Sequence, residues 1–385
     1  MLRVAAGIGL LSISACAGIS SEPDSEHALS LVISDGVTYF GTDDGQHFAV
    51  DIATGLQTWG VKTDEESHTF STVVGKLVYY GSIDGHLYAL ETESGQNRWD
   101  IATGGSTWSA PTIHNGLAYL TGDDGTLYAV DAVTGQERWR YQSGDSARFS
   151  RPAVVGGVVF FGSYDRNLHA VDALTGEGIW RFNTGDFIAA SPAVSDGVVY
   201  IGGGDGFLYA VSADTGRELW SLDVGGEVHS SSDVEEGVIY LGTGDGYVHA
   251  IDLNTREERW KFGTRATSET LLHNAVHTSY VLQDSLLSFG SHDGYVYAVD
   301  VDTGEKIWAV KAGEAFNSSP AIANGLVYYV DIEENLIGVD IEGGAAETDD
   351  LTGAVRIRTG LGWTTPLDRV GAQVVRTRFE LVFPA

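Results

Sequence analysis

The sequence predicts an all-β fold, an eight-bladed β-propeller with seven blades as the alternative, and three observations support it. A segment such as LYAVDAVTGQERW (127–139) recurs along the chain and closes on a tryptophan. The steps between these tryptophans are 40, 40, 41, 40, 40 and 48 residues, a period typical of solenoids and propellers. Large apolar residues alternate with small or polar ones inside the repeat, which is the periodicity of strands.

Two kinds of turn divide each repeat into four strands. An Asp-Gly pair such as Asp124-Gly125 lies between two apolar runs, where it suits the positive φ angles of a tight hairpin. Blade four has Asp165-Arg166-Asn167 at this place, which predicts a wider hairpin. A second turn, such as 131–135 (DAVTG), follows the third strand; its Asp can accept backbone N–H groups and its Gly takes the left-handed position. Each repeat is therefore a four-stranded antiparallel meander, the size of a propeller blade.

The repeated tryptophans are interpreted as packing residues. A lone blade leaves both faces of its sheet uncovered, and a ring that buries roughly 150–250 Å² is well suited to fill the space between neighbouring blades. The structural blade tryptophans are Trp59, Trp99, Trp139, Trp180, Trp220, Trp260 and Trp308.

The start of the chain has the pattern of an export signal. A short charged start precedes an apolar run of about a dozen residues, too short to span a bilayer. Residues 13–15 (ISA) have the form of a lipobox, and Cys16 is the single cysteine, so Cys16 is the predicted lipid attachment site. An ordinary signal peptide with a chance cysteine is the alternative.

The chain divides into four predicted parts. These are a signal peptide with lipobox at 1–16, a linker at 17–27, the propeller at 28–350, and closing strands or a face-covering tail at 351–385. Residues 354–359 (AVRIRT) are a candidate fourth strand for blade eight, which lacks the tryptophan. The tail from Leu351 is basic on an otherwise acidic chain.

The composition restricts the partners. The net charge is −31, from 53 acidic and 22 basic residues, of which only five are lysine. This charge repels a nucleic-acid backbone, so a nucleic-acid partner is not expected. Two interpretations stay open for the acidic surface: a soluble, self-repelling protein, or adaptation to a high-salt habitat.

A candidate binding site follows from the positions that differ between repeats. The first strand of each blade is expected to line the central channel, and three residues before its Pro position the residue type changes from blade to blade. Framework positions are kept alike by packing, so variable ones are free to serve a ligand. The hypothesis is one channel mouth lined by His68, Trp108, Arg148, Phe149, His229 and Asn317. The competing interpretation is that these are ordinary rim residues with no ligand.

No catalytic residue and no metal site is predicted. The 11 histidines show neither an HExxH motif nor paired H-x-H spacing, and no G-x-S-x-G motif is present. The Asp-Gly turns lack the ligand density of a calcium-binding loop.

The order of motifs, A-x-D-x-x-T-G-x-x-x-W, resembles the pyrroloquinoline-quinone (PQQ)-type propeller repeat over nearly all of 28–342. Quinone dehydrogenases of this type are much longer. Their insertions carry a calcium site, a catalytic Asp and often adjacent cysteines, whereas this chain is short and has one cysteine. The bare, lipobox-bearing chain looks like the BamB-like family, the lipoprotein subunit of the outer-membrane β-barrel assembly machinery.

This resemblance implies a non-enzymatic, exported scaffold with no cofactor. It would be a monomeric propeller that binds envelope proteins through one face and is held at the membrane by a lipid anchor. The expected location is the periplasmic side of the outer membrane in a Gram-negative cell, or the outer face of the cytoplasmic membrane in an archaeon. The alternative function is a PQQ-binding redox protein or sensor.

Overall fold

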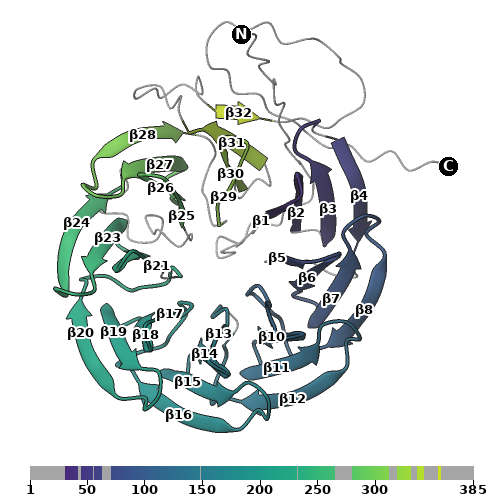
Figure 1. Cartoon of the computed structure of the whole chain (residues 1–385), viewed down its shortest axis with the longest axis horizontal. Helices are drawn as coiled ribbons and strands as arrows, with labels where there is room; N and C mark the ends of the chain where they lie inside the picture. Colours follow the sequence, from purple (N-terminus) through teal and green to yellow (C-terminus); the bar gives the residue numbers. More distant parts are fainter. Residues whose placement is uncertain are drawn as a thin grey trace, which may run out of the picture.

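The computed structural model describes residues 31–41, 45–54, 56–62, 71–147, 149–231, 233–264, 280–311, 319–330, 336–341 and 354–356. Within these ranges the strands form eight four-stranded antiparallel sheets, each made of four consecutive strands. The sheets are arranged as blades in a ring around a central axis (Figure 1). The predicted all-β propeller with eight blades is confirmed, and the seven-bladed alternative is wrong.

The strand bounds follow the chain in order. Blades one and two contain β1 (Leu31–Ser34), β2 (Val37–Gly41), β3 (Gln46–Asp51), β4 (Leu56–Lys62), β5 (Ser71–Val74), β6 (Leu77–Gly81), β7 (His86–Glu91) and β8 (Asn97–Ala102). Blades three and four contain β9 (Thr112–His114), β10 (Leu117–Thr121), β11 (Thr126–Asp131), β12 (Glu137–Gln142), β13 (Ala153–Val155), β14 (Val158–Gly162), β15 (Asn167–Asp172) and β16 (Gly178–Asn183). Blades five and six contain β17 (Ala193–Ser195), β18 (Val198–Gly202), β19 (Phe207–Ser212), β20 (Glu218–Asp223), β21 (Asp233–Glu235), β22 (Val238–Gly242), β23 (Tyr247–Asp252) and β24 (Glu257–Gly263). Blades seven and eight contain β25 (Tyr280–Gln283), β26 (Leu286–Gly290), β27 (Tyr295–Asp300), β28 (Lys306–Lys311), β29 (Ala321–Ala323), β30 (Leu326–Val330), β31 (Leu336–Asp340) and β32 (Ala354–Arg356).

The first strand of each blade lies innermost and the fourth lies outermost (Figure 1). The inner strand β1 contacts both β5 and β29, so blade one adjoins blade eight as well as blade two. The fourth strand of blade eight is β32, which falls inside the segment predicted to close the ring. The predicted signal peptide at 1–16, with Cys16, and the linker at 17–27 lie outside the described residues.

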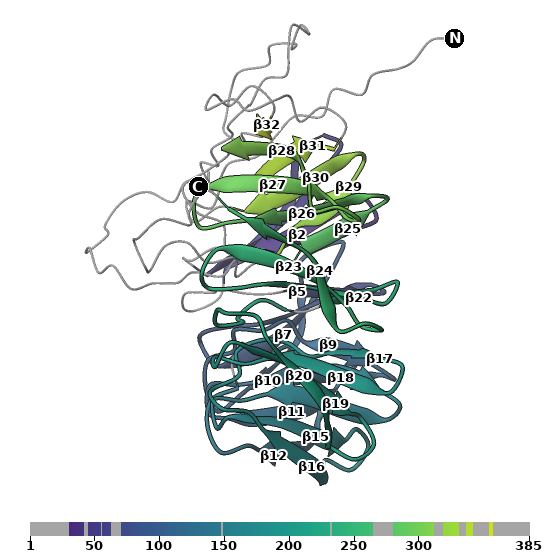
Figure 2. The same ribbon diagram turned by 90° about the vertical axis from the view of Figure 1, so that its left-hand side faces the viewer.

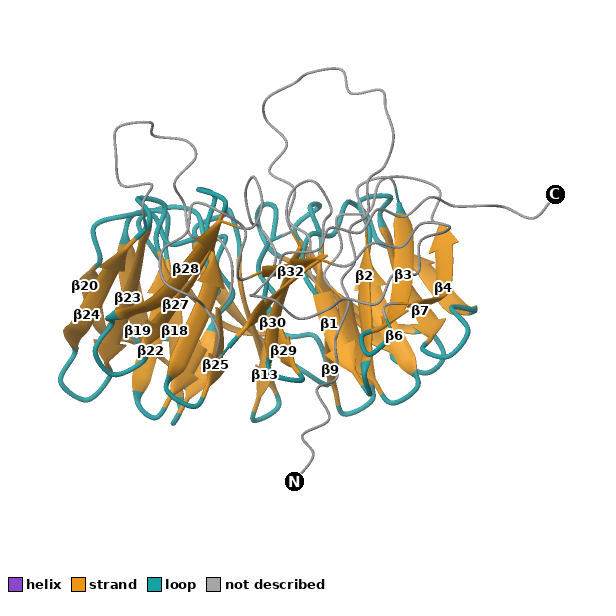
Figure 3. Ribbon diagram, turned by 90° about the horizontal axis from the view of Figure 1, so that it is seen from above, coloured by secondary structure: helices purple, strands orange, loops and turns teal. Residues whose placement is uncertain are grey.

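The turns collect on two opposite faces of the ring, as the side views show (Figures 2 and 3). On one face, which we call the turn face, the turn between strands one and two of a blade contacts the turn between strands three and four. There Ala132 N–H donates to the Gly116 carbonyl at 2.9 Å. On the opposite face, which we call the crossover face, the turns between strands two and three meet the connections from blade to blade. There Asp123 N–H donates to the Ser106 carbonyl at 2.8 Å.

The blade tryptophans pack between blades. Trp139 lies opposite the fully buried Ala129 on the neighbouring strand, and its indole N–H donates to the Ala173 carbonyl in blade four at 3.2 Å. A Cβ placed on Gly176 of that turn would lie 2.7 Å from the indole, so glycine is required for this contact. The same indole-to-carbonyl bond joins Trp59 to Thr92, Trp99 to Ala132, Trp180 to Ala213 and Trp260 to Val301.

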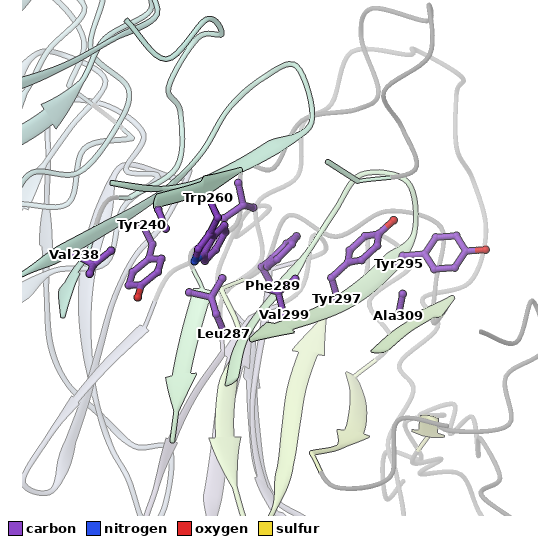
Figure 4. Packing of buried hydrophobic residues seen from close by; sticks show 11 residues of the cluster. Val238, Tyr240, Trp260, Leu287, Phe289, Tyr295, Tyr297, Val299 and Ala309 are labelled. Carbon is purple, nitrogen blue, oxygen red and sulfur yellow. The ribbon is translucent and has the colours of Figure 1, made fainter. Parts of the chain in front are cut away.

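The core is divided among the interfaces between blades. Between blades six and seven, Tyr240 and Trp260 pack against Leu287, Phe289 and Tyr297, all buried (Figure 4). Each such interface removes large apolar side chains from water, which is the main stabilising term of the ring.

The turns between strands two and three correct two predictions. Of the Asp-Gly pair, only the glycine has a positive φ angle, 75° at Gly125; the Asp124 carboxylate instead accepts hydrogen bonds from Thr126 N–H at 2.9 Å and the Tyr128 hydroxyl at 2.7 Å. The hairpin of blade four is not wider, because Arg166 adopts φ 69° in the place of glycine. The extra residue of the 41-residue step lies in the longer connection between β12 and β13.

The turn between strands three and four agrees with the prediction. The Asp131 carboxylate accepts hydrogen bonds from the N–H groups of Val133 and Thr134, at 3.2 and 2.9 Å, and Gly135 has φ 72°. The Arg138 guanidinium, 2.6 Å away, and the hydrogen bonds from Thr134 and Val133 hold the pKa of Asp131 well below its usual range.

Candidate functional site

The connections of the crossover face are packed tightly against the blades. Gly162 and Gly202 end the second strands of blades four and five, and a Cβ on either would lie 2.2 Å from Ile188 or Val228, respectively. Because these contacts involve buried side chains of the next connection, the glycines allow that connection to lie directly on the end of the strand.

Backbone hydrogen bonds then fix each connection to the turn of the blade that follows it. Tyr164 N–H donates to the Ser146 carbonyl at 2.8 Å, and Gly204 N–H donates to the Phe187 carbonyl at 2.9 Å. Gly244 N–H donates to the Glu227 carbonyl at 2.8 Å. The side chains at these positions therefore project from a rigid framework.

Five aromatic side chains of this face form a continuous series, which we call the aromatic arc. Its members, from blade three to blade six, are Trp108, Phe149, Tyr164, Phe187 and His229. Successive ring centroids are 5.8, 6.2, 5.1 and 5.6 Å apart, and every pair is tilted. These separations lie in the range of favourable aromatic pairs. All five side chains are partly exposed, so the arc presents ring surface to solvent.

The arc contains three of the six residues predicted to line the channel mouth. Trp108, Phe149 and His229 belong to it, whereas His68, Arg148 and Asn317 lie outside the described residues. Trp108 contacts Phe149 directly, and the ring contacts of Tyr164 and Phe187 connect this pair to His229.

Sequence reasoning missed Tyr164 and Phe187, although a signal for both exists. Phe187 lies five positions before Pro192, a place occupied by Ser106 in the connection to blade three. Tyr164 lies in the turn between strands two and three, where blade three has Asp123. Both places change residue type from blade to blade, which is the criterion that selected Trp108.

His229 ends the arc in an ion-pair geometry. Its Nε2 lies 2.9 Å from the Glu227 carboxylate, and the side chains are 22% and 58% exposed. A pair this open to water contributes little to stability, about 0–1 kcal/mol. Its consequence is local, because it holds the imidazole beside Phe187.

Carboxylates lie in the segments that carry the arc. Asp123, Asp145, Asp186 and Glu227 belong to the same turns and connections as the five rings. The Asp186 carboxylate accepts the backbone N–H of Phe187 at 2.8 Å, so its charge lies beside the backbone of an arc residue. The face therefore combines aromatic surface with negative potential.

Arg151 is a cation on the inner wall of the ring. Its Nε donates to the Thr112 hydroxyl at 3.3 Å, and its backbone N–H donates to the Ser191 hydroxyl at 3.0 Å. The side chain is exposed to solvent, yet the surrounding protein lowers its pKa through desolvation. The pKa of an arginine is so high in water that Arg151 stays charged at neutral pH despite this lowering.

Two kinds of feature are absent from the part of the chain that the structure describes. No group of three or more His, Cys, Asp or Glu side chains there is placed to hold a metal ion. No helix in the same residues is long and apolar enough to cross a membrane.

A PQQ-repeat family model, described as outer membrane protein assembly factor BamB, matches residues 44–181 and 164–357. The match covers every blade in whole or in part. A search of curated proteins found no match.

Several solved structures share the fold. BamB from Moraxella catarrhalis superposes with a TM-score of 0.69 at 18% identity, over 85% of this chain and 98% of that chain. The computationally designed Ika8 protein gives 0.70 at 18% identity, over 86% and 98%. The quinohemoprotein alcohol dehydrogenase ADHIIG from Pseudomonas putida HK5 gives 0.66 at 16% identity, over 87% and 72%. At these identities the likeness concerns the fold alone.

Proposed function

Because this chain belongs to the PQQ-repeat propeller family described as outer membrane protein assembly factor BamB, we propose that it is a non-enzymatic scaffold that binds proteins at the cell envelope. The observation that carries the proposal is the aromatic arc on the crossover face. At the positions of the arc, the residue type differs from blade to blade, whereas the backbone hydrogen bonds of the connections recur in neighbouring blades.

The arc has the properties of a protein-binding surface. Large aromatic side chains dominate the binding energy of many interfaces, and here their rings are partly exposed. The backbone bonds at Phe187 and Tyr164 hold the rings in place before a partner arrives. Such preorganisation lowers the entropy that binding must overcome.

Export and anchoring complete the proposal. The lipobox pattern before Cys16 supports lipid attachment at that residue, with 17–27 as the linker between membrane and propeller. Replacing Cys16 with serine should move the protein from the membrane fraction to the soluble fraction. Retention of Cys16→Ser in the membrane fraction would argue against the anchor.

Site-specific photocrosslinking tests the scaffold function. A photoreactive phenylalanine analogue at position 187 should capture one or a few discrete partners in producing cells. The matched control is position 174, because Leu174 is 82% exposed but lies on the turn face. An absence of crosslinks at 187, or the same products at both positions, would count against a scaffold that works through the crossover face.

A PQQ-binding redox protein is the second candidate, and the ring faces of Trp108 and Phe149 favour it because a planar quinone stacks on such surfaces. The negative charges near the arc do not fit PQQ binding. PQQ carries carboxylates, and Asp123, Asp186 and Glu227 would repel them. Titration of the purified protein with PQQ, with and without calcium, should therefore show no stoichiometric binding; binding weakened by Trp108→Ala would favour the redox function.

A further inference from the structure

We propose that the aromatic arc receives a cationic, arginine-containing polypeptide segment. The inference rests on the proposed scaffold function and specifies the chemistry of the partner. Two properties of the crossover face support this inference: it has ring faces that accept a cation and carboxylates that attract one.

The geometry of the arc supplies the ring faces. Its four ring pairs are all tilted, with interplanar angles of 39–56°. Rings tilted in this way cover little of one another's faces, and all five side chains are partly exposed. A guanidinium or ammonium within about 6 Å of such a ring is attracted by its quadrupole.

The charge of the face selects the sign of the partner. Asp145 and Glu227 are exposed, and Asp123 and Asp186 are half-buried, all in segments that carry arc residues or adjoin them. The described arginines of the same turns and connections are Arg151, on the inner wall, and Arg166, beside Tyr164. Acidic groups therefore prevail, and the whole chain, at −31, adds long-range attraction for a cationic segment.

Arginine fits this surface better than lysine. Its planar guanidinium stacks on aromatic faces and is more weakly hydrated than an ammonium, and it forms two parallel hydrogen bonds with one carboxylate. Phe187 and Asp186 are consecutive residues, so one connection carries both a ring and a carboxylate, and the carboxylate bonds to the backbone N–H of Phe187. A segment with arginines at alternate positions can place several side chains along the arc.

Calorimetric titration of the full chain with the synthetic peptide (Arg-Gly)4 tests the proposal. We expect binding that is weaker for (Lys-Gly)4 and absent for (Glu-Gly)4. Phe187→Ala should weaken binding of the arginine peptide by about threefold to thirtyfold, the range of a cation–π contact. Glu227→Gln should weaken it as well.

Two control variants separate the arc from the general charge of the protein. Asp302→Asn removes one exposed carboxylate from the turn face, and Leu174→Ala removes exposed apolar surface there. Both should bind (Arg-Gly)4 as the unmodified protein does. Equal weakening by Asp302→Asn and Glu227→Gln would show a non-specific charge effect and overturn the proposal.

The chain's own C-terminal segment is a possible competitor, since 357–385 carries Arg358, Arg369, Arg376 and Arg378. A full-length variant with these four arginines changed to glutamine is therefore titrated in parallel. If the arginine-to-glutamine variant binds the peptide and the unmodified protein does not, the proposal is supported, provided that adding Phe187→Ala to that variant abolishes binding. The proposal is overturned if neither the unmodified protein nor the arginine-to-glutamine variant binds the peptide, or if Phe187→Ala leaves binding unchanged. Partner crosslinks at position 187 would in that case leave the scaffold function intact.

Discussion

The ring of Phe187 lies directly over Gly204, in the turn of the blade that its connection enters. A Cβ on Gly204 would lie 2.7 Å from Cε1 and 2.9 Å from Cζ of that ring. Gly204→Ala should therefore displace Phe187 and weaken binding of the arginine peptide by about twofold to fivefold. Gly244 has the same place in blade six, where the nearest atoms to a Cβ are 3.6–3.9 Å away, so Gly244→Ala should leave titration curves unchanged. Equal curves for both variants would show that this contact does not position the ring.

The contact between Trp139 and Gly176 predicts a large stability effect. Gly176→Ala adds strain at φ 75° and places a methyl group 2.7 Å from the indole. Gly197→Ala is the matched control, because Gly197 also has φ 75° but no atom within 4 Å of a Cβ. Urea unfolding should show a loss of about 1–2 kcal/mol for the control and a larger loss for Gly176→Ala. Equal losses would mean that the indole moves aside at no cost.

Blade six departs from the turn pattern and predicts a gain in stability. Arg256 has φ 62° where the other blades have glycine, and within the described residues Trp220 lacks the indole-to-carbonyl bond seen for Trp139. Arg256→Gly should relieve about 1–2 kcal/mol of left-handed strain and let Trp220 approach the turn. Arg166→Gly relieves similar strain at φ 69° in a turn without a tryptophan, so its melting temperature should rise less.

Blades one and eight each contain a buried hydroxyl without a partner in the described structure. Tyr328, in blade eight, and Thr38, in blade one, are both 0% exposed and make no hydrogen bond. Tyr328→Phe and Thr38→Val should each raise stability by about 1 kcal/mol, because they remove an unsatisfied group. Tyr79 has the place of Tyr328 in blade two, and its hydroxyl donates to the Ala132 carbonyl at 3.0 Å, so Tyr79→Phe should lower stability instead. If urea unfolding showed changes of the same sign in the unfolding free energy for Tyr79→Phe and Tyr328→Phe, the Tyr328 hydroxyl would not be the unsatisfied group.

His47 predicts acid sensitivity. Burial lowers the pKa of His47 to about 3, whereas the unfolded value is 6.5. Between these pH values the unfolded state binds the proton and the folded state does not, so stability falls as the pH falls, by up to about 1.4 kcal/mol per pH unit. Blades two and three have leucine at the strand position of His47, namely Leu87 and Leu127. The variant His47→Leu should make the unfolding free energy depend less on pH between about pH 6 and about pH 4. Parallel curves for the two proteins would show that His47 does not carry the effect.

The repeat made the fold predictable from sequence. In the Trp139 region, the tryptophan and the turn at Asp131 recur often enough in the sequence to indicate their roles. The position of Ala129 opposite Trp139 comes from the structure. The hairpin of blade four was mispredicted because residue type does not fix φ: Arg166 accepts the left-handed conformation within a turn that its neighbours impose. Blade eight was recognised without its tryptophan because its apolar runs keep the same spacing.

The candidate site was only half predictable. Comparing one place across blades found Trp108, Phe149 and His229. Tyr164 and Phe187 occupy other places in the repeat, and the path of the connections decides which places meet in space. That path depends on close contacts such as Val228 against Gly202, which the spacing of motifs does not reveal.

Hydrogen–deuterium exchange on the complex with the crosslinked partner tests the central claim most directly. Binding through the aromatic arc predicts slower exchange in 163–166 and 184–192, with the outer strands β16 and β20 unchanged. Protection confined to the outer strands or the turn face, with 163–166 and 184–192 exchanging as in the free protein, would contradict the assignment of the crossover face as the binding surface.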